Sequence, residues 1–355
     1  MKRIDITKYS HPVVFFSNGI GDAFMALPSL RALSQASSGR LVLLCKTGVH
    51  ARHFSDVAVH GVVETDIRRQ DGVPMFDAAR AAELIGRCDL FLSLVPWHSP
   101  ALSRLLALLQ PAMSAGFFPD YTIVLPRDYR KHSSELAFDV PLLVDPDLRI
   151  TDYAGAPRLP ESGMRDAAAI IGACANRRIL TVHADTVAEK MWPSRCFRET
   201  LDEFLHRHGD FVALVVGKTP QDIAGGPHVG RIVPCYGLPL ETSCALVAQS
   251  ALFLGVDSCM LHAADSFGVP GVGLFGPTSP AEFGFRFARH VHVRAGTSTA
   301  RITPDDVLAA LEQVLNEPEA DRCELEFGNT SGDPPEDADG PLTFKSGRDR
   351  TRLAF

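Results

Sequence analysis

The sequence predicts an α/β protein made of two similar halves, each with a parallel sheet covered by helices on both faces. Short apolar runs alternate with helical patterns along most of the chain. This alternation is typical of parallel sheets with crossover helices. It starts again near residue 177, after a stretch rich in Pro, Asp and Gly. With 355 residues, the chain also exceeds what one hydrophobic core usually serves.

In the first half, strands are expected at short runs of mainly apolar residues. They lie at Val13–Phe16, Leu41–Cys45, Gly61–Thr65, Leu90–Val95, Ser114–Phe117 and Ile123–Leu125. Helices are expected at Ala26–Ser34, Phe76–Gly86 and Ala101–Leu109. From Pro141 to Pro160 the periodicity is weak, so we interpret this segment as the start of an interdomain connection. A helix is expected near that hinge, at Arg165–Ala175.

The second half repeats the pattern. Strands are expected at Ile179–His183, Phe211–Val216, Arg231–Pro234, Ala251–Val256 and Val272–Phe275. Helices are expected at Ser194–His208, Glu241–Gln249, Met260–Phe267 and Asp305–Leu315, the first with Ser194 as its N-cap. Beyond Glu317 the chain is acidic, rich in Gly and Pro and poor in aliphatic residues, so this tail is expected to be flexible.

The composition favours a cytoplasmic enzyme. The net charge is −7, but the residues from Glu317 onward include ten acidic and five basic side chains, so the rest of the chain is nearly neutral. Such a charge argues against a nucleic-acid partner. The eight cysteines form no C-x-x-C pair, which indicates reduced thiols rather than a disulfide framework. We see no stretch as long as a transmembrane helix and no apolar core of a signal peptide.

The first motif, Gly19-Ile20-Gly21-Asp22, directly follows the first expected strand. Its glycines let the backbone approach a ligand, and open α/β sheets bind ligands at the carboxyl ends of their strands. Residue 24 is Phe rather than Gly, so the dinucleotide fingerprint is incomplete and an NAD site is disfavoured. Asp22 is a candidate general base for an acceptor hydroxyl, kept ionised by the helix N-terminus. The simpler alternative is that Asp22 only caps its helix.

A second polar loop follows the strand at Ile179–His183 and carries Asp185, Thr186 and Lys190. Lys190 is a candidate phosphate ligand, acting as a mobile point charge, with the Thr186 hydroxyl beside it as a hydrogen-bond donor. Trp192-Pro193 is expected to be structural and to set the exit of the loop. The alternative is an ordinary surface lysine.

The third motif lies where the strand ending at Val256 meets a helix N-terminus, whose backbone N–H groups form an anion site. The N–H groups of Ser258 and Cys259 are expected to receive a diphosphate, with the Ser258 hydroxyl in reach. Asp257 is poorly placed for a phosphate, so we expect it to hold a sugar hydroxyl or to order the loop. His262 faces either the site or the core, and a satisfied core histidine is the simpler expectation.

Taken together and in chain order, these motifs resemble the bacterial ADP-heptose:lipopolysaccharide heptosyltransferases, a glycosyltransferase family with the GT-B fold. The matching residues are Gly21-Asp22 with Leu27-Pro28, then Lys190-Met191-Trp192-Pro193, and finally Asp257-Ser258-Cys259, His262 and Gly276-Pro277-Thr278. The matches span residues 13–280. Each alone is weak, and their combination is specific.

The resemblance implies two Rossmann-like α/β domains that face each other across a cleft. Residues 1–150 would form the N-terminal acceptor-side domain, and residues 177–316 the C-terminal nucleotide-sugar-binding domain. Residues 151–176 would supply the linker and hinge helix, and residues 317–355 the acidic tail.

The resemblance also implies an inverting, metal-independent transfer of a heptose, or a similar sugar, from an ADP-sugar to an acceptor hydroxyl. The ADP-sugar is a substrate, and no cofactor is implied. Asp22 would be the general base, and Lys190 would neutralise the leaving diphosphate with the helix N–H groups at Ser258 and Cys259. The implied donor-binding residues are Gly21, Asp185, Thr186, Gln221, Asp222, Leu238, Asp257, Ser258, Cys259 and His262. Among them, Leu238 would line the base, and Gln221 or Asp222 would hold the ribose.

The acceptor stays open among a glycolipid, a small-molecule glycoside and a protein. Residues 1–150 carry sixteen basic and fifteen acidic side chains, and the acceptor-side strand end contains Trp97 and His98. These features suit a neutral or smaller acceptor better than an acidic glycolipid. Two positions depart from the family pattern. Cys259 stands where the family has a glycine, and Asp185 stands where the family often has a small residue.

Two alternatives to a transferase are a GT-B nucleotide-sugar epimerase and a nucleotide-sugar-binding protein without catalysis. An epimerase would not need a base for an acceptor hydroxyl. Asp22 and Lys190 together argue against a protein that only binds.

Overall fold

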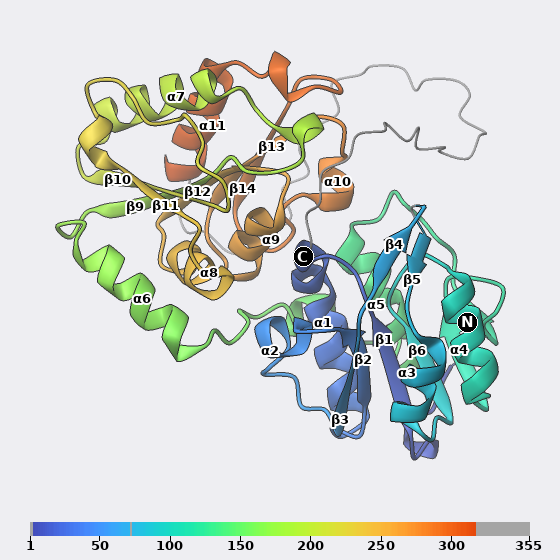
Figure 1. Ribbon diagram of the computed structural model, residues 1–355. Helices are drawn as coiled ribbons and strands as arrows, with labels where there is room; N and C mark the ends of the chain where they lie inside the picture. The colour runs from blue at the N-terminus through green and yellow to red at the C-terminus, as the bar shows by residue number, and fades with distance from the viewer. Residues whose placement is uncertain (1–2, 72, 317–355) are drawn as a thin grey trace. The chain divides into compact units, whose positions relative to one another are not determined.

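The computed structural model describes residues 3–71 and 73–316, and within them it contains two six-stranded parallel sheets (Figure 1). The order of the first sheet is β3-β2-β1-β6-β7-β8, and that of the second is β11-β10-β9-β12-β13-β14. Numbered within each half, both follow the order 3-2-1-4-5-6 of the doubly wound fold. The predicted α/β class with two similar halves is confirmed.

The first sheet consists of β1 (Pro12–Phe16), β2 (Val42–Lys46), β3 (Gly61–Thr65), β6 (Leu90–Ser93), β7 (Met113–Gly116) and β8 (Ile123–Val124). Helix α1 (Ile20–Ala36) packs with α2 (Val49–His53) and α5 (Ser133–Val144), while α3 (Ala78–Ile85) packs with α4 (Pro100–Leu109). A small antiparallel pair, β4 (Arg68–Gln70) and β5 (Val73–Met75), lies outside the sheet. The core between sheet and helices is built from fully buried side chains such as Phe15, Leu30 and Phe91.

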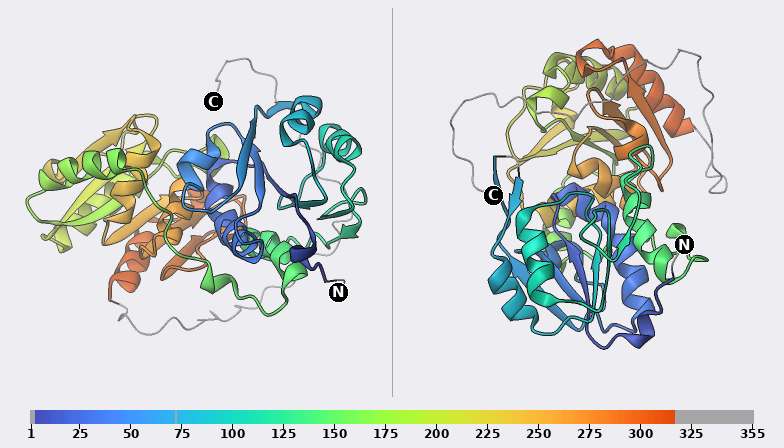
Figure 2. Two further views of the ribbon diagram at one scale, coloured as in Figure 1. Left: turned by 90° about the horizontal axis from the view of Figure 1, so that it is seen from below. Right: turned by 90° about the vertical axis from the view of Figure 1, so that its right-hand side faces the viewer.

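The second sheet consists of β9 (Arg178–His183), β10 (Phe211–Gly217), β11 (Ile232–Tyr236), β12 (Leu252–Val256), β13 (Gly271–Phe275) and β14 (His290–Arg294). Helices α7 (Ser194–Arg207) and α11 (Pro304–Asn316) pack on one face, over a core that includes Trp192 and Phe197. Helices α6 (Glu161–Gly172), α8 (Leu240–Ala248) and α9 (Cys259–Ser266) pack on the other, over Phe253 and Leu246. Figure 2 shows these two helix layers from two further directions. A short helix, α10 (Pro280–Phe283), follows β13.

The expected strands are confirmed within a few residues, but the sequence analysis did not predict α2, α10 or the β4–β5 pair, and further features differ from it. Helix α5 occupies the beginning of the segment interpreted as a connection, because its apolar residues Leu136, Val140 and Leu143 bury against the first core in spite of Pro141. The edge strand β14 was not expected. Ser194 is the first residue of α7 rather than its N-cap. The N-cap is Pro193, so α7 has no side-chain capping hydrogen bond at its N-cap. The expectation for the acidic tail concerns residues outside those the structure describes.

The strand order explains where a site can form. In each sheet the order reverses between the first and fourth strands, β1 and β6 in one and β9 and β12 in the other. Ligands of doubly wound folds bind at the carboxyl ends of strands beside this reversal. The three sequence motifs follow β1, β9 and β12, so all three lie at these two points.

Candidate active site

Asp22 lies in the first turn of α1, directly after β1, and is half-buried. Its Oδ2 accepts a hydrogen bond from the backbone N–H of Gly19, 3.0 Å away, so the carboxylate does cap its helix. Burial nevertheless raises the pKa of Asp22 above its usual value, although the Gly19 hydrogen bond opposes the shift. The net shift is therefore opposite in direction to the one expected from the helix N-terminus alone. A base with a raised pKa binds a proton more strongly.

Three charged side chains contribute further to the electrostatics of Asp22. The Asp257 carboxylate raises the pKa of Asp22, while Lys190 and Arg69 lower it. These groups come from the loops after β12 and β9 and from strand β4. The predicted base and the predicted phosphate ligand therefore belong to one electrostatic cluster, although their strands belong to different sheets.

Gly21 is the point where α1 meets α9. A Cβ atom at this position would lie 2.7 Å from His262 Cδ2 and 3.3 Å from the Cα of Cys259. The absence of a side chain lets the two helix N-termini approach closely. Gly21, His262 and Cys259, all predicted as donor-site residues, are thus in direct contact.

Asp257 organises the C-terminal part of the cluster. Its Oδ2 accepts hydrogen bonds from Lys190 Nζ and from Thr278 Oγ1, each at 2.6 Å. Its backbone carbonyl accepts one from Thr186 Oγ1 at 3.2 Å. Lys190 is therefore held in an ion pair rather than free as a mobile point charge. Thr278 belongs to the Gly-Pro-Thr motif, but the sequence analysis did not name it as a site residue.

Ser258 is the N-cap residue of α9, and its Oγ lies 2.9 Å from Nδ1 of His183 at the end of β9. Burial lowers the pKa of His183 to about 4, so this imidazole is neutral near pH 7. Cys259 is the first residue of α9 and has no positive φ, so the backbone accepts a Cβ where the family has glycine. Burial raises the pKa of its thiol to about 11. The α9 N-terminus is accordingly flanked by neutral groups, His183 and Cys259.

His262 is buried, and its Nε2 lies 4.0 Å from Oδ1 of Asp257. Burial lowers its pKa to about 4, so it does not neutralise Asp257. Its Nδ1 is a buried nitrogen with no hydrogen-bond partner. The expectation of a satisfied core histidine is therefore wrong for this nitrogen.

The remaining predicted donor residues form a second group, after β9, β10 and β11. The Asp185 carboxylate accepts hydrogen bonds from the backbone N–H groups of Lys218 and Thr219, at 2.9 and 2.8 Å. It thereby orders the loop after β10. Asp222 pairs with Arg198 of α7 at 2.6 Å, and the Gln221 carbonyl accepts a hydrogen bond from Tyr236. Leu238 is half-buried against the core under α8 and α9. Among the described residues, no hydrogen bond or ion pair is seen between this group and Lys190 or Asp257.

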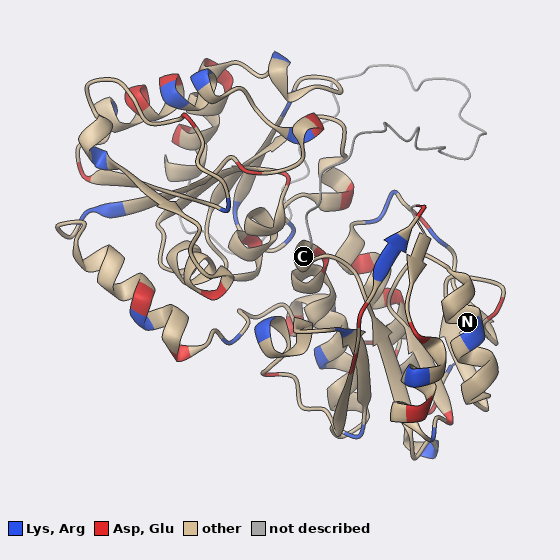
Figure 3. Cartoon of the chain, viewed as in Figure 1, with Lys and Arg blue, Asp and Glu red and all other residues tan. Residues whose placement is uncertain are grey.

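At the carboxyl ends of β1 and β6 in the first sheet, Trp97 Nε1 donates a hydrogen bond to Asn18, which joins the loops after these strands. Nε2 of His98 lies 3.0 Å from Ser103 Oγ and 3.6 Å from Asp120 Oδ2. Figure 3 shows β4 in blue because it carries Arg68 and Arg69. The end of this sheet is therefore polar and contains charges of both signs.

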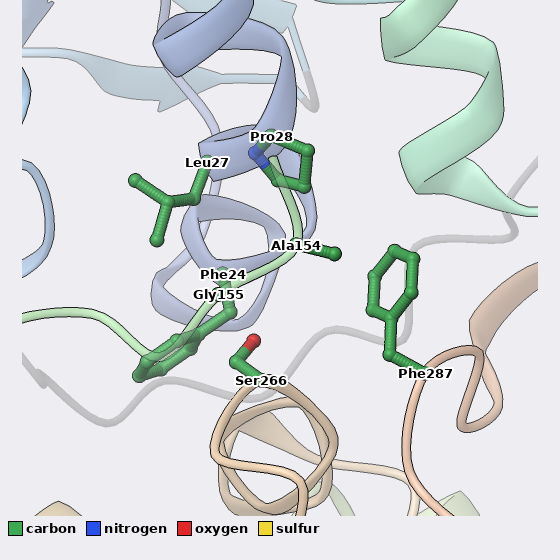
Figure 4. A pocket seen from close by; sticks show the side chains of 7 residues that line it. All are labelled: Phe24, Leu27, Pro28, Ala154, Gly155, Ser266 and Phe287. Carbon is green, nitrogen blue, oxygen red and sulfur yellow. The ribbon is translucent and has the colours of Figure 1, made fainter. Parts of the chain in front are cut away.

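A hollow between α1 and the C-terminal part of α9 does not suit the donor (Figure 4). It is lined by Phe24, Leu27, Pro28, Ala154, Gly155, Ser266 and Phe287. Among these residues only Ser266 has a polar side chain. A diphosphate requires cationic side chains or helix N-terminal N–H groups, which this lining does not provide.

No group of three or more His, Cys, Asp or Glu side chains in residues 3–71 and 73–316 is arranged to hold a metal ion. No helix in the same residues combines the length and apolarity required to cross a bilayer.

Comparisons with known proteins agree with this geometry. Residues 129–304 match the model of glycosyltransferase family 9 (heptosyltransferase), a match that includes the whole second sheet. A comparison with curated protein sequences gave no match. Similar solved structures include a family 9 glycosyl transferase from Veillonella parvula, with 19% identity, a TM-score of 0.71 and coverage of 88% of this chain and 99% of that one.

Two Escherichia coli structures are similar as well. ADP-heptose lps heptosyltransferase II has 15% identity and a TM-score of 0.65, with coverage of 86% of this chain and 98% of that one. Heptosyltransferase WaaC with ADP has 17% identity and a TM-score of 0.62, with coverage of 85% and 97%. At these identities, the structures establish the shared fold.

The fold and the family match define the class: the chain is a glycosyltransferase with the GT-B fold. More specifically, the resemblance to the heptosyltransferase family is confirmed, because residues 129–304 match glycosyltransferase family 9 (heptosyltransferase) and the two Escherichia coli heptosyltransferase structures share the fold.

Proposed function

We propose that the chain transfers a heptose, or a similar sugar, from an ADP-sugar to an acceptor hydroxyl with inversion at the anomeric carbon. One observation carries the proposal: Asp22, after β1 of one sheet, shares an electrostatic cluster with Lys190 and Asp257, after β9 and β12 of the other. A transferase needs a base for the acceptor and a cation for the leaving group at one reacting centre. The ADP in the WaaC structure, together with the family description, supports an ADP-sugar as donor.

In the proposed reaction, the acceptor oxygen attacks the anomeric carbon as the bond from that carbon to the phosphate oxygen breaks. Asp22 takes the proton of the acceptor hydroxyl, and ADP leaves with the electron pair of the broken bond. Lys190 and the backbone N–H groups of Ser258 and Cys259 stabilise the charge that grows on the departing diphosphate. No metal is required in this scheme, because these groups supply the positive potential.

The other predicted donor residues are assigned to the same substrate. Thr186 and His262 would lie at the phosphate and sugar, Leu238 at the base, and Gln221 or Asp222 at the ribose. Asp185 orders the loop after β10, which we propose to border the ribose.

For the acceptor, we propose a neutral or small glycoside. Support comes from the near balance of charge in residues 1–150 and from Trp97 and His98 at the end of the first sheet. Because His98 lies beside Asp120 as well as Ser103, this end presents no uniformly positive surface to a phosphorylated glycolipid.

The test is to incubate the full chain with ADP-heptose, alone and with a panel of neutral and phosphorylated acceptors, and to quantify free ADP. UDP-N-acetylglucosamine serves as the control donor. The proposal predicts ADP release that depends on an acceptor, and a glycosylated product visible by mass spectrometry. A changed sugar without any acceptor would instead indicate the epimerase alternative. Donor binding without turnover under any of these conditions would contradict the proposal.

A further inference from the structure

We propose that Asp257 is a positioning residue: it holds the Lys190 ammonium at the phosphate site and acts on the transfer reaction through that lysine. The inference rests on the function proposed above. Of the two roles expected for Asp257 from the sequence, it extends the ordering of the loop and sets aside the contact with a sugar hydroxyl.

The contacts of Asp257 leave its carboxylate little freedom. Its Oδ2 accepts hydrogen bonds from Lys190 and Thr278, which come from the loops after β9 and β13. Its backbone N–H donates to the carbonyl of Leu274, 3.2 Å away, and its own carbonyl accepts from Thr186. The residue is thus fixed by neighbours on both sides of β12. A carboxylate held in this way imposes its geometry on the lysine that it binds.

The two partners differ in exposure. The side chain of Lys190 is 27% exposed, whereas that of Asp257 is only 5% exposed. An incoming ligand can therefore reach the ammonium more readily than the carboxylate. An ammonium has three donors, so Lys190 can bind a phosphate oxygen while it remains bonded to Asp257.

Lys190 is also the cation that compensates the buried carboxylate. His262 lies 4.0 Å from Oδ1, but its burial keeps it neutral near pH 7. If Lys190 swung away to a ligand, Asp257 would be left as an uncompensated buried charge, which is strongly unfavourable. The diphosphate therefore has to bind to a lysine that is already in place. Such a preorganised charge stabilises the transition state without reorganisation during the reaction.

A contact between Asp257 and the sugar makes a different prediction. Removal of such a contact would weaken ADP-heptose binding and leave ADP binding unchanged, because ADP has no sugar at that place. A positioning role predicts that ADP and ADP-heptose respond alike.

The experiment is a double-mutant cycle with Lys190→Met and Asp257→Asn, in which binding of ADP and ADP-heptose is measured by titration calorimetry. Lys190→Met is expected to weaken ADP binding most, since it leaves a buried carboxylate facing the anion. The double variant is expected to bind ADP more tightly than Lys190→Met alone, with a coupling of about 2- to 150-fold. Asp257→Asn alone is expected to bind ADP no more weakly than the natural chain.

Turnover supplies a second measurement. Asp257→Asn is expected to lower kcat with little change in KM, because Lys190 remains but is no longer held. Added to Lys190→Met, it is expected to cause no further loss of kcat. The exposed pair Arg80 and Glu83 on α3, which are 2.7 Å apart, is the control: Arg80→Met and Glu83→Gln should show no coupling in ADP binding.

The inference is overturned if the double variant binds ADP no better than Lys190→Met, or if Asp257→Asn weakens binding of ADP-heptose alone. Thermal melting of each variant checks folding. If Asp257→Asn does not fold, the comparison of Lys190→Met with the double variant still decides, because the double variant has no unpaired buried charge. Failure of the natural chain to bind ADP would overturn the proposed function as well, whereas an absent coupling in a chain that binds ADP would overturn only the role of Asp257.

Discussion

Asp22 and Asp257 are carboxylates that follow strands of different sheets, and their surroundings give them different chemistry. Asp22 bonds to a backbone N–H group and has a raised pKa, which suits a proton acceptor. Asp257 is buried and bonded to a lysine and a threonine, which suits a structural anion. In the proposed mechanism the two carboxylates have separate tasks: Asp22 takes a proton and Asp257 holds a cation.

The pH dependence of kcat/KM tests this division. A protonated Asp22 cannot act as a base, so activity is expected to rise with pH through its pKa, which burial shifts upward. Asp257→Asn removes a negative charge near Asp22 and should move this acid limb to lower pH. Lys190→Met removes a positive charge and should move it to higher pH. Profiles from about pH 4 to about pH 9 would show both shifts.

Arg69→Gln is a further control. Because Arg69 also lowers the pKa of Asp22, its removal should shift the acid limb of the pH profile in the same direction as Lys190→Met. His262 faces the same turn of α1 through Gly21, but it is neutral near pH 7 and should not shift the limb there. Shifts in one common direction for Asp257→Asn and Lys190→Met would contradict the account.

Residue chemistry could be predicted from the sequence only where it is local. The motifs led to Asp22, Lys190 and the α9 N-terminus, because each follows an apolar strand. The ion pair between Lys190 and Asp257 spans 67 positions and leaves no trace in sequence spacing. The raised pKa of Asp22 also escaped prediction, since it depends on burial by residues distant in the chain.

Among the elements, buried strands were the most predictable. Strands such as β1 and β12 are apolar throughout because helices cover both faces of the sheet. Strand β14 alternates His and Val at a half-buried sheet edge, so its apolar signal is weak. Helix α5 escaped because Pro141 and the turn residues that follow it indicate a loop, whereas burial against α1 stabilises the helix.

The contact between α1 and α9 leads to a prediction for Gly21. Gly21→Ala places a methyl group 2.7 Å from His262 Cδ2, so one of the two helix N-termini must move. Turnover is expected to fall by about 10-fold or more, because small displacements of catalytic groups are costly. Gly19→Ala is the matched control, since its nearest neighbour would be Asp22 Oδ2 at 3.4 Å.

Alanine has a higher helix propensity than glycine, so reduced activity of Gly21→Ala could not be attributed to a weaker helix. Steady-state rates with ADP-heptose, together with thermal melting, would measure both effects. Equal activity of the two alanine variants would contradict the role of the close approach.

At the other end of α9, Asp265 leads to a prediction about stability. Its Oδ1 accepts hydrogen bonds from the backbone N–H groups of Phe287 and Ala288, at 2.7 and 2.8 Å, and burial raises the pKa of Asp265 to about 6. A folded pKa above the unfolded value means that protonation favours the folded state, and this contribution is lost as pH rises through about 6. Asp265→Asn keeps an oxygen acceptor without the charge. Its Tm relative to the natural chain is therefore expected to increase from about pH 4 to about pH 7, and a constant difference would refute this interpretation.

At the scale of the whole molecule, the strand order reverses at the equivalent position in each sheet. The loops that follow the strands at these two positions contribute to one charged cluster. Contacts between residues of the two halves extend beyond α1 and α9: His132 Nε2 lies 2.9 Å from the carbonyl oxygen of Gly284, and Arg286 pairs with Glu135 at 2.8 Å. The two-sheet α/β fold could be inferred from strand-helix alternation, whereas the strand order was not predicted. These contacts could not, because they join polar residues far apart in sequence.

Buried histidines should make the whole molecule sensitive to acid. Burial lowers the pKa of His53, His183 and His262 to about 4 and that of His292 to about 3. These pKa values in the folded protein lie below the value of about 6.5 in the unfolded chain. At a pH between the two values, the unfolded chain therefore binds more protons than the folded protein. The free energy of unfolding consequently decreases as pH falls from about 6.5 towards 4.

Denaturant unfolding at a series of pH values would measure this loss, and His53→Phe should reduce its slope. The carboxyl groups with raised pKa values, Asp22, Asp265 and Glu282, act in the opposite direction and reduce the net slope. A free energy of unfolding that stays constant or increases on acidification would contradict the expectation.

The most direct test of the central claim is the turnover of Asp22→Asn with ADP-heptose and an accepted acceptor, measured beside its affinity for the donor. The asparagine oxygen can still accept the hydrogen bond from Gly19, so the helix cap is retained. The account predicts that kcat falls by about 10²- to 10⁴-fold while donor affinity is unchanged, since the base acts on the acceptor. Full turnover by the Asn variant would contradict it and leave Asp22 with the role of a helix cap alone.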